Sequence, residues 1–225
     1  MKNEPTNTRT GFLGCITAGT THELNNVLAV IQESAGLMED LILLSPKSEQ
    51  NPREAFIQSL AAINNQIHRG VTLLTHLNRL VHSSDEKTKT INLRQTIEGM
   101  ITLCQRFAKM KQAELTSAET FPELDLSTQP LTLQMAIFSG IQVCLDNAVI
   151  GDRIKLGSEK KGNQISIHIL IENNASIERK TVDPRLSPYW KSLVSAASQL
   201  EGTVESAPAY AGIHLHLPDC LESSP

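Results

Sequence analysis

The sequence predicts an α+β fold, in which an N-terminal antiparallel helical hairpin is followed by an α/β sandwich. Three observations predict it: two stretches of helically spaced apolar residues before residue 83, a polar boundary after it, and strand-like alternation beyond residue 150. A chain of 225 residues is long enough to bury a hydrophobic core without disulfides or metals. We expect a hairpin domain over residues 1–83, a sandwich domain over residues 91–218 and a polar tail over residues 219–225.

The first helix is predicted by apolar residues that recur at steps of four and three, which places them on one face. They are Leu24, Leu28, Ile31, Ala35, Met38 and Ile42. The pattern stops at Ser45 and Pro46, because a residue that precedes a proline disfavours the helical conformation. Gly11, Gly14 and Gly19 lie before the stripe, so the start of this helix stays open.

The second helix has a clear start and a regular apolar stripe. Asn51 can cap the helix, Pro52 suits its first position, and Glu54 can complete a capping box. The stripe repeats every seven residues at Leu60, Ile67, Leu74 and Val81, with Ile63, Val71 and Leu77 between them. We expect this stripe to pack antiparallel on the first helix. A single hairpin leaves its stripe half covered, so we expect a homodimer in which two hairpins form a four-helix bundle.

The second part of the chain changes its periodicity. Residues 83–90 include no apolar side chain, which is typical of a domain boundary. Beyond it, isoleucines at alternate positions from 165 to 171 indicate a strand with one apolar face. The expected elements are helices over 94–109, 131–148 and 188–200, and strands over 153–158, 164–172, 203–207 and 213–217. They predict helices on one face of a mixed sheet.

The composition excludes several classes of function. A net charge of −4 and an aromatic content of 4% argue against a basic or stacking surface for nucleic acids. The N-terminus is polar, and no stretch approaches the length of an apolar membrane span. The four cysteines are too far apart for a zinc knot or a dense disulfide framework, so we expect reduced thiols. These features predict a soluble, cytoplasmic protein without nucleic-acid or membrane partners.

Residues 21–31 read Thr-His-Glu-Leu-Asn-Asn-Val-Leu-Ala-Val-Ile. This run resembles the H box of two-component histidine kinases, in which a phosphoacceptor histidine is followed by an acid and, four residues after the histidine, by asparagine or threonine. The run lies on the first helix of a predicted hairpin, and an α/β domain follows, which is the order found in that family. The resemblance covers nearly the whole chain.

The resemblance implies a role for five residues. His22 would be the phosphoacceptor, since a largely neutral imidazole has a ring nitrogen free to attack phosphorus. Glu23 would accept a hydrogen bond and a proton from the other ring nitrogen. Asn26, one helical turn further along, would orient a water or a phosphoryl oxygen. Ala29 and Glu33 continue this face and would contact a docked receiver domain.

The ATP-binding motifs of that family are degenerate in this sequence. An ungapped alignment puts Val143 at the asparagine that holds magnesium, and a weaker alignment, shifted by four residues, puts Asn147 there. Residues 172–177 resemble the adenine motif but lack its two glycines and have Glu172 in place of aspartate. Residues 179–188 occupy the place of the glycine-rich lid and contain no glycine. The sequence therefore predicts that the fold is kept and the nucleotide site is lost.

This combination resembles the histidine phosphotransferases built as degenerate histidine kinases. The resemblance implies phosphoryl relay between receiver-domain aspartates, with response-regulator receivers, and possibly a hybrid histidine kinase, as partners. No cofactor of its own is expected, because Mg²⁺ would come from the receiver. Two alternatives stay open: a non-catalytic pseudokinase that inhibits a kinase or a response regulator, and a divergent ATP-dependent autokinase that uses Asn147 and Glu172. A receiver phosphatase activity through Asn26 is compatible with the relay.

Other histidines are expected to be ordinary. His214 and His216 share a face of a predicted strand, but no third ligand is spaced nearby, so we do not expect a metal site. His68, His76 and His82 on the second helix do not share one face and are expected to be solvated.

Overall fold

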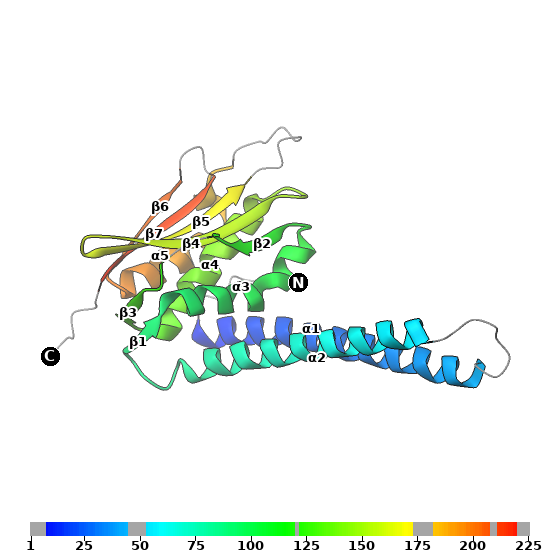
Figure 1. Cartoon of the computed structure of the whole chain (residues 1–225). Coiled ribbons are helices and arrows are strands. Elements are labelled where there is room, and N and C mark those ends of the chain that lie inside the picture. Colours follow the sequence, from blue (N-terminus) through cyan, green and yellow to red (C-terminus); the bar gives the residue numbers. More distant parts are fainter. Residues whose placement is uncertain (1–7, 45–52, 120–121, 173–181, 208–210, 220–225) are drawn as a thin grey trace.

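The computed structural model describes residues 8–44, 53–119, 122–172, 182–207 and 211–219. A long helical hairpin projects from an α/β part in which helices lie between a sheet and the base of the hairpin (Figure 1). The hairpin consists of α1 (Arg9–Leu44) and α2 (Arg53–His82). The α/β part contains β1 (Lys89–Asn92), α3 (Leu93–Met110), β2 (Glu114–Ser117), β3 (Asp125–Thr128), α4 (Pro130–Asn147), β4 (Arg153–Lys161), β5 (Gln164–Glu172), the 3-10 helix η2 (Pro184–Leu186), α5 (Trp190–Gln199), β6 (Thr203–Ser206) and β7 (Gly212–Pro218). The predicted fold class, a hairpin followed by helices on a mixed sheet, is confirmed.

The main sheet has the strand order β2-β4-β5-β7-β6. β2 runs parallel to β4, and the other neighbours are antiparallel. Ile165, Ile167, Ile169 and Ile171 of β5 are buried against the helices, as their alternation predicts. Lys161 pairs with Gln164, so β4 and β5 join through the two residues between them, of which Gly162 has a positive φ of 60° that suits a primed hairpin turn.

The structure settles the open start of the first helix and adds three strands that the sequence did not predict. α1 begins at Arg9 and includes all three glycines, because packing against the α/β part outweighs their poor helix propensity. A Cβ at Gly19 would lie 3.3 Å from the ring of Phe107, so the glycine allows α1 and α3 to approach closely. The strands β1, β2 and β3 were not expected, since each has four residues and too short an alternation to stand out.

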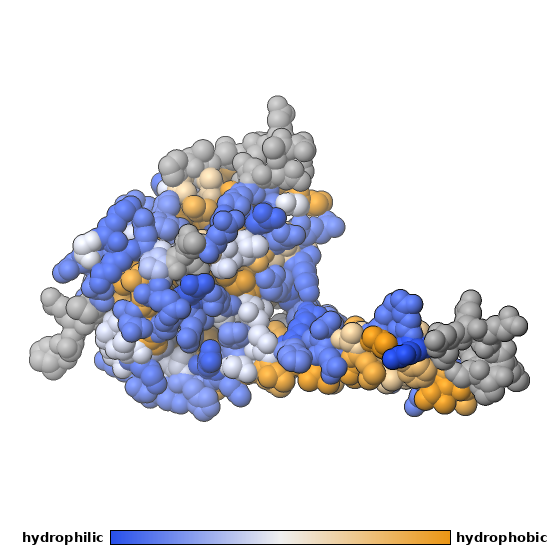
Figure 2. All heavy atoms as spheres, viewed as in Figure 1, coloured by the Kyte–Doolittle hydropathy of each residue, from blue (hydrophilic) through white to orange (hydrophobic). Residues whose placement is uncertain are grey.

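Most of the heptad stripe of α2 is exposed and does not pack against α1 as expected, although Ile63 and Leu77 are half-buried. Six apolar side chains of α2 are between 47% and 58% exposed: Ile57, Leu60, Ile67, Val71, Leu74 and Val81. The two helices instead meet through a different set, in which a Cβ at Gly70 would lie 3.4 Å from Val27, and Leu73 is buried. Apolar side chains are consequently visible along the hairpin where it extends beyond the α/β part (Figure 2).

One hydrophobic core joins the base of the hairpin to the α/β part. Phe12 and Ile16 of α1 and Leu80 of α2 belong to the same buried cluster as the residues of α3, α4 and the sheet. The ring centroids of Phe12 and Phe138 are 5.2 Å apart, and those of Phe107 and Phe138 are 5.7 Å apart. The first two turns of α1 are therefore part of the sandwich core as well as of the hairpin.

Among the described residues, no helix combines the length and the apolar character that a membrane span requires.

Candidate functional site

His22 lies on the exposed side of α1, beyond the part of the helix that is buried in the shared core. The amide nitrogen of Asn26, one turn further along, is 3.3 Å from His22 Nδ1. With the amide in this orientation, its N–H donates to Nδ1, so the ring proton of a neutral imidazole is on Nε2. A half-turn of the amide would let its oxygen accept from Nδ1–H and leave the lone pair of Nε2 free. Asn26 is thus placed to select the tautomer of His22.

Ala29 and Glu33, the expected receiver contacts, are also exposed on α1. Steps of four, three and four residues from His22 through Asn26 place all four side chains on one face of the helix. The structure leaves this face uncovered by the α/β part.

Glu23 has surroundings different from those expected. Its side chain is 8% exposed, and its carboxylate accepts hydrogen bonds from Arg69 of α2 and, at 3.4 Å, from Lys109 Nζ of α3. Both Glu23 and His22 are described, and the structure shows no hydrogen bond between them. Successive residues of a helix lie about 100° apart around its axis, so a side chain next to His22 points elsewhere. Glu23 here connects both helices of the hairpin to α3.

Arg69 and Lys109 were not identified from the sequence. They are 46 and 86 residues from Glu23, and a single sequence carries no signal for a pair formed across such separations. A buried carboxylate requires a partner, so the burial of Glu23 would have been the only indication.

The two polar side chains at the C-terminal end of α4, Asp146 and Asn147, both form hydrogen bonds within the protein. Val143, which the ungapped alignment puts at the position of the metal-binding asparagine, is fully buried. The Asn147 amide donates to the Val143 carbonyl at 3.2 Å, and Asp146 accepts from Ser187 Oγ at 2.8 Å. Glu172 pairs with Lys155 at 3.0 Å. The rest of the adenine motif, residues 173–177, and the start of the lid, residues 179–181, lie outside the described residues.

On the outer face of the main sheet, His168 lies beside His214, a contact that the sequence did not reveal. His168 of β5 is opposite His214 of β7 in the strand register, and their Nδ1 atoms are 2.6 Å apart. Burial lowers the pKa of His168, while Glu159, 3.3 Å from its Nε2, opposes that effect. Burial, followed by the neighbouring His168 and His216, lowers the pKa of His214. His168 is thus a third histidine beside His214 and His216 that sequence spacing did not indicate, and no three His, Cys, Asp or Glu side chains of the described ranges are arranged to hold a metal.

His76 is not solvated as expected. It is half-buried, and a Cβ at Gly99 of α3 would lie 2.9 Å from its Nδ1, so the imidazole packs directly on that helix. Burial and the nearby Arg79 lower the pKa of His76. His68 and His82 are exposed, as expected.

Comparison with known proteins gives a likeness in structure alone. No family model and no curated protein matches the sequence. The catalytic domain of histidine kinase ThkA matches with a TM-score of 0.50 at 10% identity, covering 61% of this chain and 100% of that domain. Histidine kinase AdeS of Acinetobacter baumannii (TM-score 0.48, 11% identity, 88% of this chain and 98% of that chain) and a histidine kinase of Burkholderia phymatum STM815 (0.49, 9%, 90% and 98%) were also found. The match to the ThkA domain shows that this chain contains the fold of a histidine kinase catalytic domain.

Proposed function

We propose that this protein is a histidine phosphotransferase of two-component signalling, which relays phosphoryl groups between receiver-domain aspartates through His22. The observation that carries the proposal is the combination of an exposed His22, contacted by Asn26, with a kinase-like α/β part in which Val143, aligned from the sequence with the metal-binding asparagine, is buried. A valine side chain has no atom that ligates a metal. The histidine chemistry is thus retained where the ATP chemistry is not.

The transfer step requires the rotated orientation of the Asn26 amide, in which its oxygen, and not the nitrogen seen 3.3 Å from Nδ1, faces the ring. Nε2 of neutral His22 attacks the phosphorus of an aspartyl phosphate on the receiver, a P–N bond forms, and the P–O bond to the aspartate breaks. Asn26, with its oxygen toward Nδ1–H, would stabilise the reactive tautomer and the charge that develops on the ring. Attack by the aspartate of a second receiver reverses the step. Mg²⁺ bound in the receiver would neutralise the phosphoryl charge, as positioning and charge neutralisation supply most of the catalysis of phosphoryl transfer.

Glu23 remains a proposed participant, but its carboxylate would have to leave Arg69 and Lys109 to reach the imidazole. In the arrangement seen here it holds α1 against α2 and α3. This contact supports a role in fixing the α/β part beside the phosphoacceptor.

The exposed α2 stripe supports the proposed homodimer. Six large apolar side chains in water on one face of a 30-residue helix form the pattern of an incomplete four-helix bundle. A second hairpin, related by a two-fold axis, would cover the stripe with its own copy. We propose that receivers dock on the His22 face of this bundle and contact Ala29 and Glu33.

The relay is tested by offering the purified protein a receiver that has been labelled with radioactive phosphate on its aspartate. We expect acid-labile label on the native protein, its passage to a second receiver, and no label on His22→Ala. His68→Ala is the matched control, because His68 is an exposed histidine on the other helix of the hairpin. Label that persists in His22→Ala would overturn the proposal.

Incubation with labelled magnesium ATP alone separates the alternatives. Label that depends on His22 would show an autokinase, and the loss of the nucleotide site would then be the wrong inference. A protein that takes no label from either donor, yet still inhibits a kinase when His22 is replaced, would be a pseudokinase.

A further inference from the structure

The C-terminal end of α3 lies beside the turn of α1 that carries the phosphoacceptor. A Cβ at Gly19 of α1 would lie 3.3 Å from the Phe107 ring of α3. His22 and Glu23 follow Gly19 by three and four residues, so they flank the same direction on the next turn of the helix. Glu23 is the buried one of the two and contacts Lys109 of α3, whereas His22 is exposed. The last turn of α3 is therefore the part of the α/β region next to His22.

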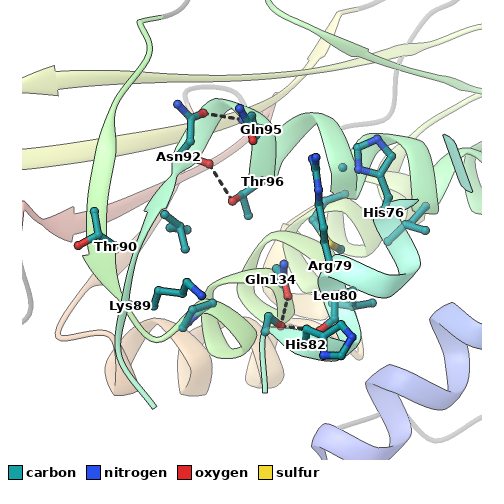
Figure 3. A pocket seen from close by; sticks show the side chains of 16 residues that line it. His76, Arg79, Leu80, His82, Lys89, Thr90, Asn92, Gln95, Thr96 and Gln134 are labelled. Atoms are coloured by element: carbon teal, nitrogen blue, oxygen red, sulfur yellow. Dashed lines mark hydrogen bonds between the residues drawn. The ribbon is translucent and has the colours of Figure 1, made fainter. Parts of the chain in front are cut away.

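The position of α3 is fixed by a second contact with the hairpin. In its first half, Gly99 packs on His76 of α2, where a Cβ would lie 2.9 Å from His76 Nδ1 (Figure 3). The start of the helix is capped, since Asn92 Oδ1 accepts from Gln95 N at 2.9 Å. Because α3 packs on α2 near its start and on α1 near its end, the side chains of its last turn are held at the phosphoacceptor turn.

Two cations face the single carboxylate of Glu23. Arg69 and Lys109 both donate to the same oxygen, Oε2. The Glu23 side chain is 8% exposed, whereas those of Arg69 and Lys109 are 38% and 59% exposed. One carboxylate and two cations leave one positive charge in excess, and this charge lies one residue from His22.

Lys109 is the partner that can leave Glu23 at low cost. Its Nζ is 3.4 Å from Oε2, at the long end of the hydrogen-bond range, and an ion pair with so exposed a lysine adds little to stability. Arg69 would still compensate the buried carboxylate. The ammonium of a lysine ends a flexible four-carbon stem, so it can turn from one anion to another beside it.

A phosphoryl group on His22 would be a stronger partner for this ammonium than Glu23 is. It carries about two negative charges and three acceptor oxygens near neutral pH. Charge-assisted hydrogen bonds to such oxygens are stronger than those between neutral groups. The phosphoryl group would also be repelled by the neighbouring Glu23 carboxylate, and a cation between the two anions offsets that repulsion.

We infer that Lys109 binds the phosphoryl group of phosphorylated His22, while Arg69 keeps the Glu23 carboxylate compensated. The inference rests on the proposed function, because it concerns the phosphorylated form of His22. It gives the α/β part a role in the relay that needs no nucleotide, namely to supply a cation at the phosphoacceptor. Since Lys109 exchanges one anion of α1 for another, α3 keeps an ionic contact with the hairpin in both states.

The contact is tested by ³¹P NMR of the full-length protein after reaction with phosphoramidate, which transfers its phosphoryl group to histidine nitrogens and releases ammonia. The variant His22→Ala identifies the resonance of phosphorylated His22. The pH midpoint at which this resonance titrates reports nearby charge, because a cation favours the dianion. Lys109→Met should raise the midpoint by about half a pH unit, and Lys109→Arg should keep it near the native value. Phosphorylated His68, which is exposed on α2, is the internal reference and should not change.

Lys111→Met is the matched control for the loss of charge. Lys111 is an exposed lysine two residues further along, but it pairs with Asp146 at 3.4 Å, so its replacement should leave the midpoint unchanged. In the relay assay, Lys109→Met should lower the equilibrium ratio of phosphorylated His22 to phosphorylated receiver about fivefold, and Lys111→Met should not.

The two assays separate the inference from the proposed function. A ³¹P midpoint for Lys109→Met equal to that for Lys111→Met would overturn the Lys109 contact, whatever the relay assay gives. A native protein that takes no label from any receiver would refute the relay instead, and the ³¹P midpoint would still decide whether Lys109 binds the phosphoryl group.

Discussion

The replacement Ile67→Lys tests the exposed stripe at its centre. Ile67 is 47% exposed in the single chain, and fully burying an isoleucine contributes about 1.5–3 kcal/mol, so covering its exposed half contributes about 1 kcal/mol. A two-fold dimer has two such positions, which makes the apolar loss about 2 kcal/mol, or roughly 30-fold in the dissociation constant. Burying two unpaired lysines adds a desolvation penalty, so the full effect should exceed 100-fold, about 3 kcal/mol.

Sedimentation velocity over a wide range of protein concentration measures this effect. We expect a dimer for the native protein and a monomer for Ile67→Lys at concentrations where the native protein is fully associated. Ile150→Lys is the matched control, because Ile150 is also an exposed isoleucine, at 62%, but lies in the loop before β4, away from the hairpin. A native protein that is monomeric throughout, or a control that dissociates as readily, would refute the assignment of the stripe to self-association.

Three further predictions concern the core, the buried carboxylate and the outer face of the sheet. Phe12→Ala should lower the free energy of unfolding by about 3–5 kcal/mol in urea denaturation, in one cooperative transition, whereas Met110→Ala, at an exposed site, should change it by about 0.5 kcal/mol at most. Glu23→Gln should lower the free energy of unfolding by about 1–2 kcal/mol, which is less than the loss expected for a fully buried ion pair, because Arg69 and Lys109 both reach solvent. The loss should be smaller at high salt. An unchanged free energy of unfolding would show that the contact is incidental. The free energy of unfolding should fall as the pH drops below about 6.5, because burial lowers the pKa of His168 and His214 in the folded state and the unfolded chain then binds more protons. Replacing His214 with Gln should reduce this pH dependence, as measured by urea denaturation at several pH values. An unaltered dependence would exclude the His168–His214 pair as its source.

Sequence periodicity predicted the helices and strands that have long, regular patterns. It failed where tertiary contacts determine which surface a face packs against. The helices of the hairpin and the β4–β5 pair were predictable because their patterns extend over many residues. The same periodicity misassigned the α2 stripe: it identifies an apolar face but does not say which partner covers that face. The glycines of α1 illustrate a second limit, since helix propensity left the start of α1 open, whereas the structure continues the helix through Gly19, which packs closely against Phe107.

The candidate site was predictable to a similar degree. Spacing alone put His22 and Asn26 on one face, and the 3.3 Å contact agrees with that placement. The partners of Glu23 depend on how α2 and α3 are placed around α1, which no local pattern contains. The His168–His214 contact was accessible in principle, because pairing β5 with β7 places the two residues opposite each other, but the register of distant strands is not evident in a single sequence.

The core shared by the hairpin and the α/β part also determines where the chain can be divided. A cut in the polar stretch after residue 83 would look harmless in the sequence. It would nevertheless strip Phe12, Ile16 and Leu80 of the side chains that bury them, exposing surface whose burial contributes about 1.5–3 kcal/mol for each residue. The remaining fragment would carry a matching gap beside Phe138. Neither part has a complete core by itself. Exchanging hairpins between such proteins would require replacing the first two turns of α1 together with the surface of the α/β part that they contact.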